Sequence, residues 1–158
     1  MTQKITTPEM ECALAGWFDY RQNLIVPCVY WGVGYYTHEC DLLIVSRAGY
    51  VTEVEIKISR SDLRADAKKA HGHQNQRIKY LYFAVPEKLE AAALEFAPER
   101  AGIITVRDYA PGQWSPLCKR IRAPTCIKHA PKMTDAERYK VARLGALRIW
   151  NLKRDLVA

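Results

Sequence analysis

The chain has 158 residues, of which 49% are hydrophobic and 26% charged, a composition typical of one ordinary globular domain and not of a disordered or fibrous chain. Lys and Arg outnumber Asp and Glu by 24 to 17, and the formal net charge of +7 favours a polyanionic partner. The sequence has no apolar run of about 18 residues that would span a membrane, and its first residues lack the apolar core of a signal peptide. We therefore expect a cytoplasmic protein.

The first predicted element is a helix. Thr7 offers a capping oxygen, Pro8 is tolerated at the first helical position, and Glu9 lies near the positive end of the helix dipole. Apolar side chains then recur at helical spacing to about Arg21. Residues 28–36 are aromatic and glycine-bearing without clear periodicity, which predicts an irregular segment that has room for a short strand.

Two aliphatic segments, 39–45 and 50–58, predict a β-hairpin. With a three-residue loop that ends at Gly49, the glycine takes the left-handed position that such loops favour. Counting back from this loop places Asp41 opposite Glu55, with their Cβ atoms about 4.5–5.5 Å apart. Lys57 follows Glu55 by two residues and points to the same face, because side chains alternate along a strand.

The elements after the hairpin alternate between helices and strands. Ser59 is a predicted cap for a charged helix from Leu63 to about Ala70, and residues 80–85, ended by a proline, predict a central strand. Residues 87–96 predict a helix and residues 102–106 a further strand.

The last part of the chain predicts a long loop and a helix. Prolines and basic residues cluster between Tyr109 and Pro131, and Thr134 with Glu137 then caps a helix that runs to about Leu152. The whole order predicts an α/β (α+β) fold, a mixed sheet flanked by helices, in a single domain over 1–158 with its core at about 7–106.

The convergence of Asp41, Glu55 and Lys57 predicts a chemical site. Adjacent carboxylates repel, so they need a cation between them, either the lysine or a metal ion. Mg²⁺ takes one or two protein carboxylates and leaves positions for a phosphate oxygen and a nucleophilic water, whose pKa it lowers, while the lysine can stabilise developing negative charge. The alternative is an exposed strand that points its charges into solvent and its apolar residues inward.

These residues, on a hairpin preceded by a helix and followed by a helix and a strand, resemble the PD-(D/E)XK nuclease superfamily over roughly residues 7–85. Segments 39–45, 53–63 and 81–86 resemble more narrowly the small standalone branch that includes MmcB-like DNA repair proteins and phage-borne relatives. The resemblance implies a restriction-endonuclease-like core and a DNA endonuclease, dependent on Mg²⁺ or Mn²⁺, that acts in DNA repair or phage DNA processing. Cys40 stands where the motif has proline, its least informative position.

The resemblance also implies individual roles. Asp41 and Glu55, together with Ile56, would bind the metal, and Lys57 would be the catalytic lysine. Glu53 lies on the same predicted face as Glu55 and is an alternative ligand, but its place opposite Leu43 predicts that it sits away from the cluster.

Many superfamily members add a Glu from the first helix, and here Glu9 and Glu11 compete for that role. We favour Glu11, which shares a helical stripe with Leu14 and Phe18. The alternative is that both acids only stabilise the N-terminus of the helix through its dipole.

DNA contacts are predicted in the basic segment that follows the hairpin. The candidates are Arg60, Arg64, Lys68, Lys69, His73, Gln74 and Arg77. Each is alternatively a solvated surface residue, because Asp62 and Asp66 can pair with basic side chains on the same helix. His71 and His73 are expected to cap the end of the helix and face solvent, and the alternative is that they bind a metal ion. The predicted loop between Tyr109 and Pro131 is expected to extend the DNA contacts or to bind a partner through its basic residues, Lys119, Arg120, Arg122 and Lys128.

Two other classes of function stay open. One is a noncatalytic DNA-binding or assembly subunit with a nuclease-like fold, and the other is an interaction module whose fold is stabilised by a structural zinc ion. The five cysteines form no Cys-x-x-Cys pair and are expected to be reduced, but zinc ligands are available in two sets, Cys118 with Cys126 and His129, and His38 with Cys40. A double-strand cut by a domain with one active site would suggest a homodimer.

Overall fold

A six-stranded mixed sheet forms the centre of the computed structural model, which describes residues 5–29, 39–69, 73–107 and 118–157. The strands lie side by side in chain order, with β3, β4 and β5 parallel and the outer neighbours antiparallel. Their bounds are β1 Leu24–Val29, β2 Cys40–Val45, β3 Val51–Ile56, β4 Tyr80–Pro86, β5 Gly102–Val106 and β6 Cys118–Arg122. This sheet and its helices confirm the predicted mixed α/β architecture.

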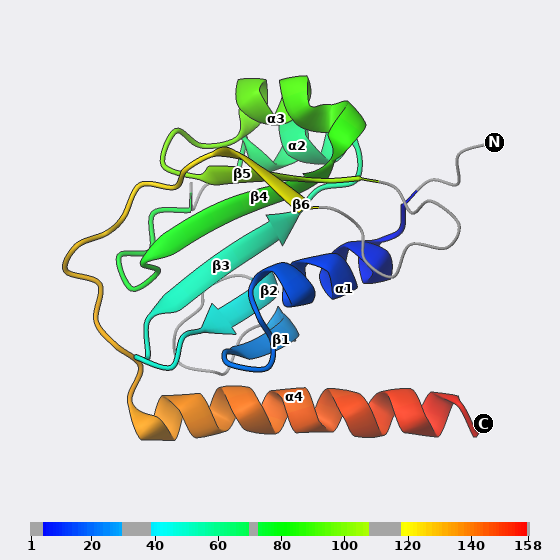
Figure 1. Cartoon of the computed structure of the whole chain (residues 1–158), viewed down its shortest axis with the longest axis vertical. Helices are drawn as coiled ribbons and strands as arrows, with labels where there is room; N and C mark the ends of the chain where they lie inside the picture. The colour runs from blue at the N-terminus through cyan, green and yellow to red at the C-terminus, as the bar shows by residue number, and fades with distance from the viewer. Residues whose placement is uncertain (1–4, 30–38, 70–72, 108–117, 158) are drawn as a thin grey trace.

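Helices cover both faces of the sheet (Figure 1). On one face, Met10 and Leu14 of α1 pack against alternate residues of the central strands, including Val54 and Ile56. On the other face lie two further apolar clusters, one beneath α2 and α3 and one beneath α4. The bounds of the helices are α1 Thr7–Trp17, α2 Arg60–Asp66, α3 Glu90–Phe96 and α4 Asp135–Asp155, with a 3-10 turn, η1 Glu87–Leu89, before α3.

The β2–β3 hairpin has the predicted register. Leu43 pairs with Glu53 and Val45 pairs with Val51. Gly49 has a φ of 91°, the left-handed conformation expected at the end of the loop, and its N–H donates to the carbonyl of Ser46 at 2.8 Å. The turn chemistry therefore determines which side chains of the two strands share a face.

The helix ends differ from the predictions. Thr6, and not Thr7, is the N-cap of α1, because the Thr6 hydroxyl and N–H both donate to the Glu9 carboxylate at 2.7 Å. The helix ends at Trp17 and not near Arg21. Ser59 caps α2 as predicted, but that helix begins directly after it and ends at Asp66, and its regular part is only seven residues long.

Both edge strands were missed by the sequence patterns. β1 contains Pro27, which is tolerated because an edge strand leaves part of its N–H groups unpaired. β6 lies inside the predicted loop, and its five residues, Cys-Lys-Arg-Ile-Arg, show no alternation of polar and apolar side chains that would predict a strand. The predicted irregular segment after residue 29 lies outside the described residues.

The capping box of Thr134 and Glu137 at the start of α4 is confirmed, and the helix continues to Asp155. α4 packs on β1 through a narrow stripe that includes Val141 and the Gly145 backbone. None of the helices in the described ranges combines the length and apolar character that a membrane crossing requires.

Candidate functional site

Strand β3 carries three buried charged residues on one face. Glu53 and Glu55 are each 1% exposed and Lys57, directly after the strand, is 7% exposed. Because side chains alternate, the intervening Val54 and Ile56 point to the opposite face and join the apolar core under α1. Charges buried in this way need partners or a cation, so the surroundings of this face define a candidate site.

The ammonium group of Lys57 lies among three carboxylates. Its Nζ is 2.5 Å from Glu55 Oε2, 3.5 Å from Asp41 Oδ2 and 3.4 Å from Asp66 Oδ1. Asp41 Oδ2 also accepts a hydrogen bond from the backbone N–H of Ile56 at 2.8 Å. The structure thus brings together Asp41, Glu55 and Lys57. It adds Asp66, for which the sequence predicts pairing with basic side chains on its own helix.

His73 forms the second half of the cluster. Its Nε2 lies 2.6 Å from Asp66 Oδ2, its Nδ1 lies 3.3 Å from Glu53 Oε1, and its ring packs edge-on against Phe83 with centroids 5.4 Å apart. The side chain is buried, so the predictions that His73 faces solvent and contacts nucleic acid are wrong. The reason is the early end of α2, after which a backbone turn with a φ of 53° at His73 directs the chain back to the sheet.

Glu53 belongs to this cluster, contrary to its predicted place away from it. It does pair with Leu43 on β2, but on its other side it pairs with Leu81 of β4, and from there its carboxylate reaches His73. Within the described part of the chain, Glu53, Glu55 and His73 are the single group of three potential metal ligands whose donor atoms all lie within 4.8 Å of one another.

The electrostatics of the cluster indicate a shortage of positive charge. Burial raises the pKa of Glu55 to about 7, and the Asp41 and Glu53 carboxylates add to the rise, although Lys57 opposes it. Burial would lower the pKa of Lys57, but Glu55, Asp41 and Asp66 outweigh it and hold the pKa above its usual value.

Burial and polar partners also have opposing effects on the pKa values of His73 and Asp66. Burial would lower the pKa of His73, but hydrogen bonds to Asp66 and Glu53 raise it to about 9. Burial would raise the pKa of Asp66, but its bonds to His73 and Lys69 and the charge of Lys57 keep it below its usual range. Lys57 and His73 are therefore the positively charged side chains inside the cluster.

The two helix-α1 candidates are now distinguished by position. Glu9 is occupied in the capping box with Thr6. Glu11 is half-buried, and its pKa is raised first by burial and then by the charge of Asp41, so it lies on the Asp41 side of the cluster. It is not part of the three-ligand group among the described residues.

The predicted DNA contacts are divided between surface positions and structural ones. Arg60 pairs with Glu95 of α3 at 2.7 Å, and Arg60 and Arg64 both lie over the Phe96 ring. Arg77 pairs with Glu137 at the start of α4. Lys68, Lys69 and Gln74 are exposed, and the Lys69 ammonium lies 2.6 Å from Asp66. His71 lies outside the described residues.

The basic segment near β6 is likewise mixed. Arg122 donates to the backbone carbonyls of Ala97, Pro98 and Ala101 and holds the α3–β5 connection, so its role is structural. Lys119, Arg120 and Lys128 are exposed. All five cysteines are free, as predicted. Cys118, Cys126 and His129 do not come together as a metal-binding group in the described chain, and His38 lies outside it.

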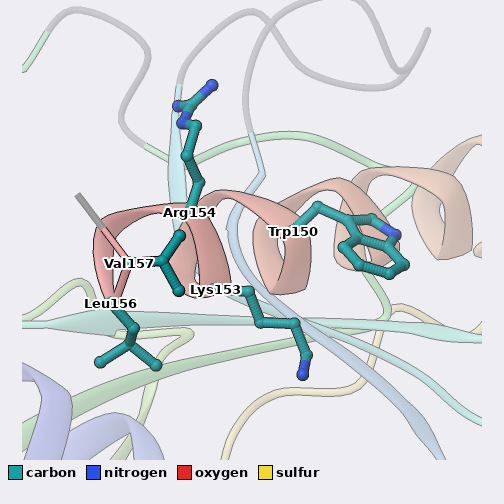
Figure 2. A pocket seen from close by; sticks show the side chains of 5 residues that line it. All are labelled: Trp150, Lys153, Arg154, Leu156 and Val157. Carbon is teal, nitrogen blue, oxygen red and sulfur yellow. The ribbon is translucent and has the colours of Figure 1, made fainter.

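A hollow of about 500 Å³ lies elsewhere, at the end of α4 (Figure 2). Its lining consists of Trp150, Lys153 and Arg154 from the last turns of α4 and of Leu156 and Val157, which follow the helix directly. It contains no acid, histidine or cysteine, so its chemistry is that of an apolar and basic surface and not of a hydrolytic centre.

Comparisons with known proteins show the fold alone. No protein-family model and no curated protein matches the chain. The structure is similar to that of the SPO1766 protein of unknown function from Silicibacter pomeroyi, with a TM-score of 0.63 and 18% sequence identity over 98% of this chain and 93% of that chain. The shared architecture extends over nearly the whole of both chains, and at this identity it carries no statement about activity.

Proposed function

We propose that the chain is a metal-dependent nuclease that hydrolyses phosphodiester bonds in DNA, in DNA repair or phage DNA processing. The observation that carries the proposal is the contact of the Lys57 ammonium with the carboxylates of both Asp41 and Glu55, which come from two different strands. The cluster lies at the carboxyl end of β3, where the parallel part of the sheet begins, and such edges commonly hold ligand sites in α/β proteins.

A divalent cation fits this donor set. Glu55 Oε1 is buried and has no hydrogen-bond partner among the described residues, and such an atom is costly to leave unpaired. Asp41 and Glu55, with Ile56 beside them, would hold Mg²⁺ or Mn²⁺, both of which bind carboxylate oxygens. When bound, the ion would supply an activated water and offset the charge of the scissile phosphate.

Lys57 contributes the protein's own positive charge. Its pKa is raised by the surrounding carboxylates, so it stays protonated at neutral pH and can donate hydrogen bonds to a phosphate oxygen or orient a water. The Ile56 N–H holds the Asp41 carboxylate in place. With these two contacts the charged groups are positioned before substrate binds, which reduces the cost of ordering them in the transition state.

DNA as the substrate is supported by charge. The chain carries a formal net charge of +7, although the cluster itself is rich in acids, so the positive charge lies mainly on the remaining surface. Exposed residues that follow the catalytic strand, including Lys68 and Gln74, and the exposed lysines and arginines near β6 are the proposed contacts with the phosphate backbone.

The test is cleavage of labelled single-stranded, duplex, flapped and junction DNAs by the full chain with Mg²⁺ or Mn²⁺. Asp41→Asn and Glu55→Gln are expected to lower the rate by at least about a thousandfold and Lys57→Met by at least about a hundredfold, since each removes a group from the reacting centre. Glu99→Gln, which makes the same change at an exposed acid, should cut like the wild type. Binding of DNA without cleavage across the panel would instead identify a noncatalytic DNA-binding subunit.

A further inference from the structure

We propose that Glu53, Glu55 and His73 form a binding site for a transition-metal dication such as Mn²⁺ or Zn²⁺, with Asp66 as a positioning residue behind the histidine. Glu53 and His73 lie outside the ligand set proposed above for the nuclease reaction, and only Glu55 is common to both. The inference concerns metal binding and does not depend on DNA cleavage.

The three donor groups are already close together. Their ligand atoms lie within 4.8 Å of one another, and all three side chains are buried. Metal–ligand bonds of about 2.0–2.2 Å leave ligand atoms about 3–4 Å apart, so small side-chain rotations would close the site. Two acids and a histidine come from different segments, β3 and the α2–β4 connection, and only the folded chain assembles them.

Glu55 supplies a second, independent observation that points to a cation site. Its Oε2 is taken by the Lys57 ammonium, whereas its Oε1 is buried without a hydrogen-bond partner in the described part of the molecule. A buried carboxylate oxygen with no donor loses its hydration without compensation. The oxygen left over by Lys57 is therefore the one available to a metal ion.

The contacts of His73 have the pattern of a metal ligand with a carboxylate behind it. The Nε2 contact with Asp66 is short, at 2.6 Å, whereas the Nδ1 contact with Glu53 is long, at 3.3 Å. In carboxylate–histidine–metal arrangements one ring nitrogen donates to an acid and the other binds the ion. Asp66 would accept from Nε2, and Phe83, edge-on to the ring, would limit its rotation and leave Nδ1 facing the two glutamates.

The donor types determine the class of ion. Mg²⁺ prefers oxygen ligands and retains several waters, whereas one imidazole nitrogen with two carboxylates suits Mn²⁺ or Zn²⁺. The enclosed position of Glu53, Glu55 and His73 also disfavours an ion that keeps a large water shell. A hundredfold excess of Mg²⁺ is therefore expected to leave bound Mn²⁺ in place.

The experiment is pulsed electron paramagnetic resonance of Mn²⁺ bound to the untagged full chain, combined with Mn²⁺ titration. We expect nitrogen-14 coupling from a directly bound imidazole in the wild type. The coupling should be lost in His73→Gln and kept in the control His129→Gln, an exposed histidine outside the cluster. Glu53→Gln and His73→Gln should each weaken Mn²⁺ binding at least about tenfold, and Asp66→Asn by about 10–100-fold with the coupling reduced.

Asp41→Asn separates this site from the one proposed for catalysis, because it should leave the nitrogen coupling in place. Bound Mn²⁺ without nitrogen coupling in the wild type would overturn the inference, as would an unchanged Mn²⁺ affinity in Glu53→Gln. The wild-type spectrum alone tests whether His73 binds the ion, even if a variant fails to fold. Metal-dependent cleavage without the coupling would refute this site alone, and coupling without cleavage would refute the proposed function alone.

Discussion

The two faces of strand β3 are equally buried and chemically opposite. Val54 and Ile56 pack into an apolar layer beneath α1, whereas Glu53, Glu55 and Lys57 face a network of charges. Apolar burial stabilises a fold at about 25 cal/mol per Å², but a buried ionic network seldom does better than the apolar residues that would fill the same space. The difference indicates that the α1 face contributes stability, and it agrees with our proposal that the charged face serves metal chemistry.

The largest loss of stability is expected from a substitution in the apolar layer beneath α1. Leu14 of α1 is fully buried, so Leu14→Ala should destabilise the chain by about 3–5 kcal/mol through lost burial and the cavity that remains. Urea unfolding would measure this loss. The folded fraction of the variant should bind Mn²⁺ like the wild type, and a loss below about 1 kcal/mol would show that this face does not carry the stability.

A smaller effect is expected on the charged face at Asp66. Asp66→Asn removes the closest partner of His73 and a partner of Lys57 and Lys69, and should cost about 2–3 kcal/mol because buried charges lose compensation. The matched control is Asp62→Asn, an exposed acid on the same helix, which should change stability by about 0.5 kcal/mol or less. Equal effects of the two substitutions in urea unfolding would contradict the assigned network.

The pH dependence of stability is the next effect in size. Glu55 and His73 both have a pKa raised in the folded state, to about 7 and about 9, from ordinary values of 4.5 and 6.5. The contribution of each group to the free energy of unfolding is fully present below its ordinary pKa and is lost as the pH rises through its folded pKa. The pKa of Asp66 is lowered, so its contribution is constant over this range.

Metal-free protein should therefore lose about 1–3 kcal/mol of stability between pH 5 and pH 9.5. Urea midpoints measured across this range would show the fall. His73→Asn should remove the fall in stability between about pH 6.5 and 9 and leave the fall between about pH 5 and 7, which belongs to Glu55. Stability that rises over the whole range would exclude these two groups as the controlling ones.

The local parts of this architecture were predictable from sequence. The hairpin register followed from Gly49 in its loop, and it brought Asp41 to the same end of the hairpin as Glu55 and Lys57. The central strands β4 and β5 followed from apolar runs that are bounded by a proline and a glycine. In each of these cases the determining interactions lie within a few residues or between adjacent strands.

The missed parts depend on long-range packing. The sequence pattern predicts a flexible histidine after a charged helix, whereas in the fold His73 is buried in contact with Glu53, twenty residues away, and with Phe83. Asp66 was assigned to pairs on its own helix, and one such pair, with Lys69, exists, but its contact with Lys57 is tertiary. The edge strand β6 has no apolar pattern of its own and forms because β5 offers a free edge.

The central claim, that the charged face exists for metal chemistry at the expense of stability, is tested most directly by thermal unfolding of wild type and Glu55→Gln at pH 8, with EDTA and with Mn²⁺. Since the pKa of Glu55 is about 7, its carboxylate is ionised at pH 8 and destabilises the metal-free fold. The account predicts that Glu55→Gln is more stable than the wild type in EDTA by about 1–2 kcal/mol. Mn²⁺ at 100 times its Kd should stabilise the wild type by about 2.7 kcal/mol and leave the variant unchanged. A variant that is less stable in EDTA and gains as much from Mn²⁺ as the wild type would contradict the claim.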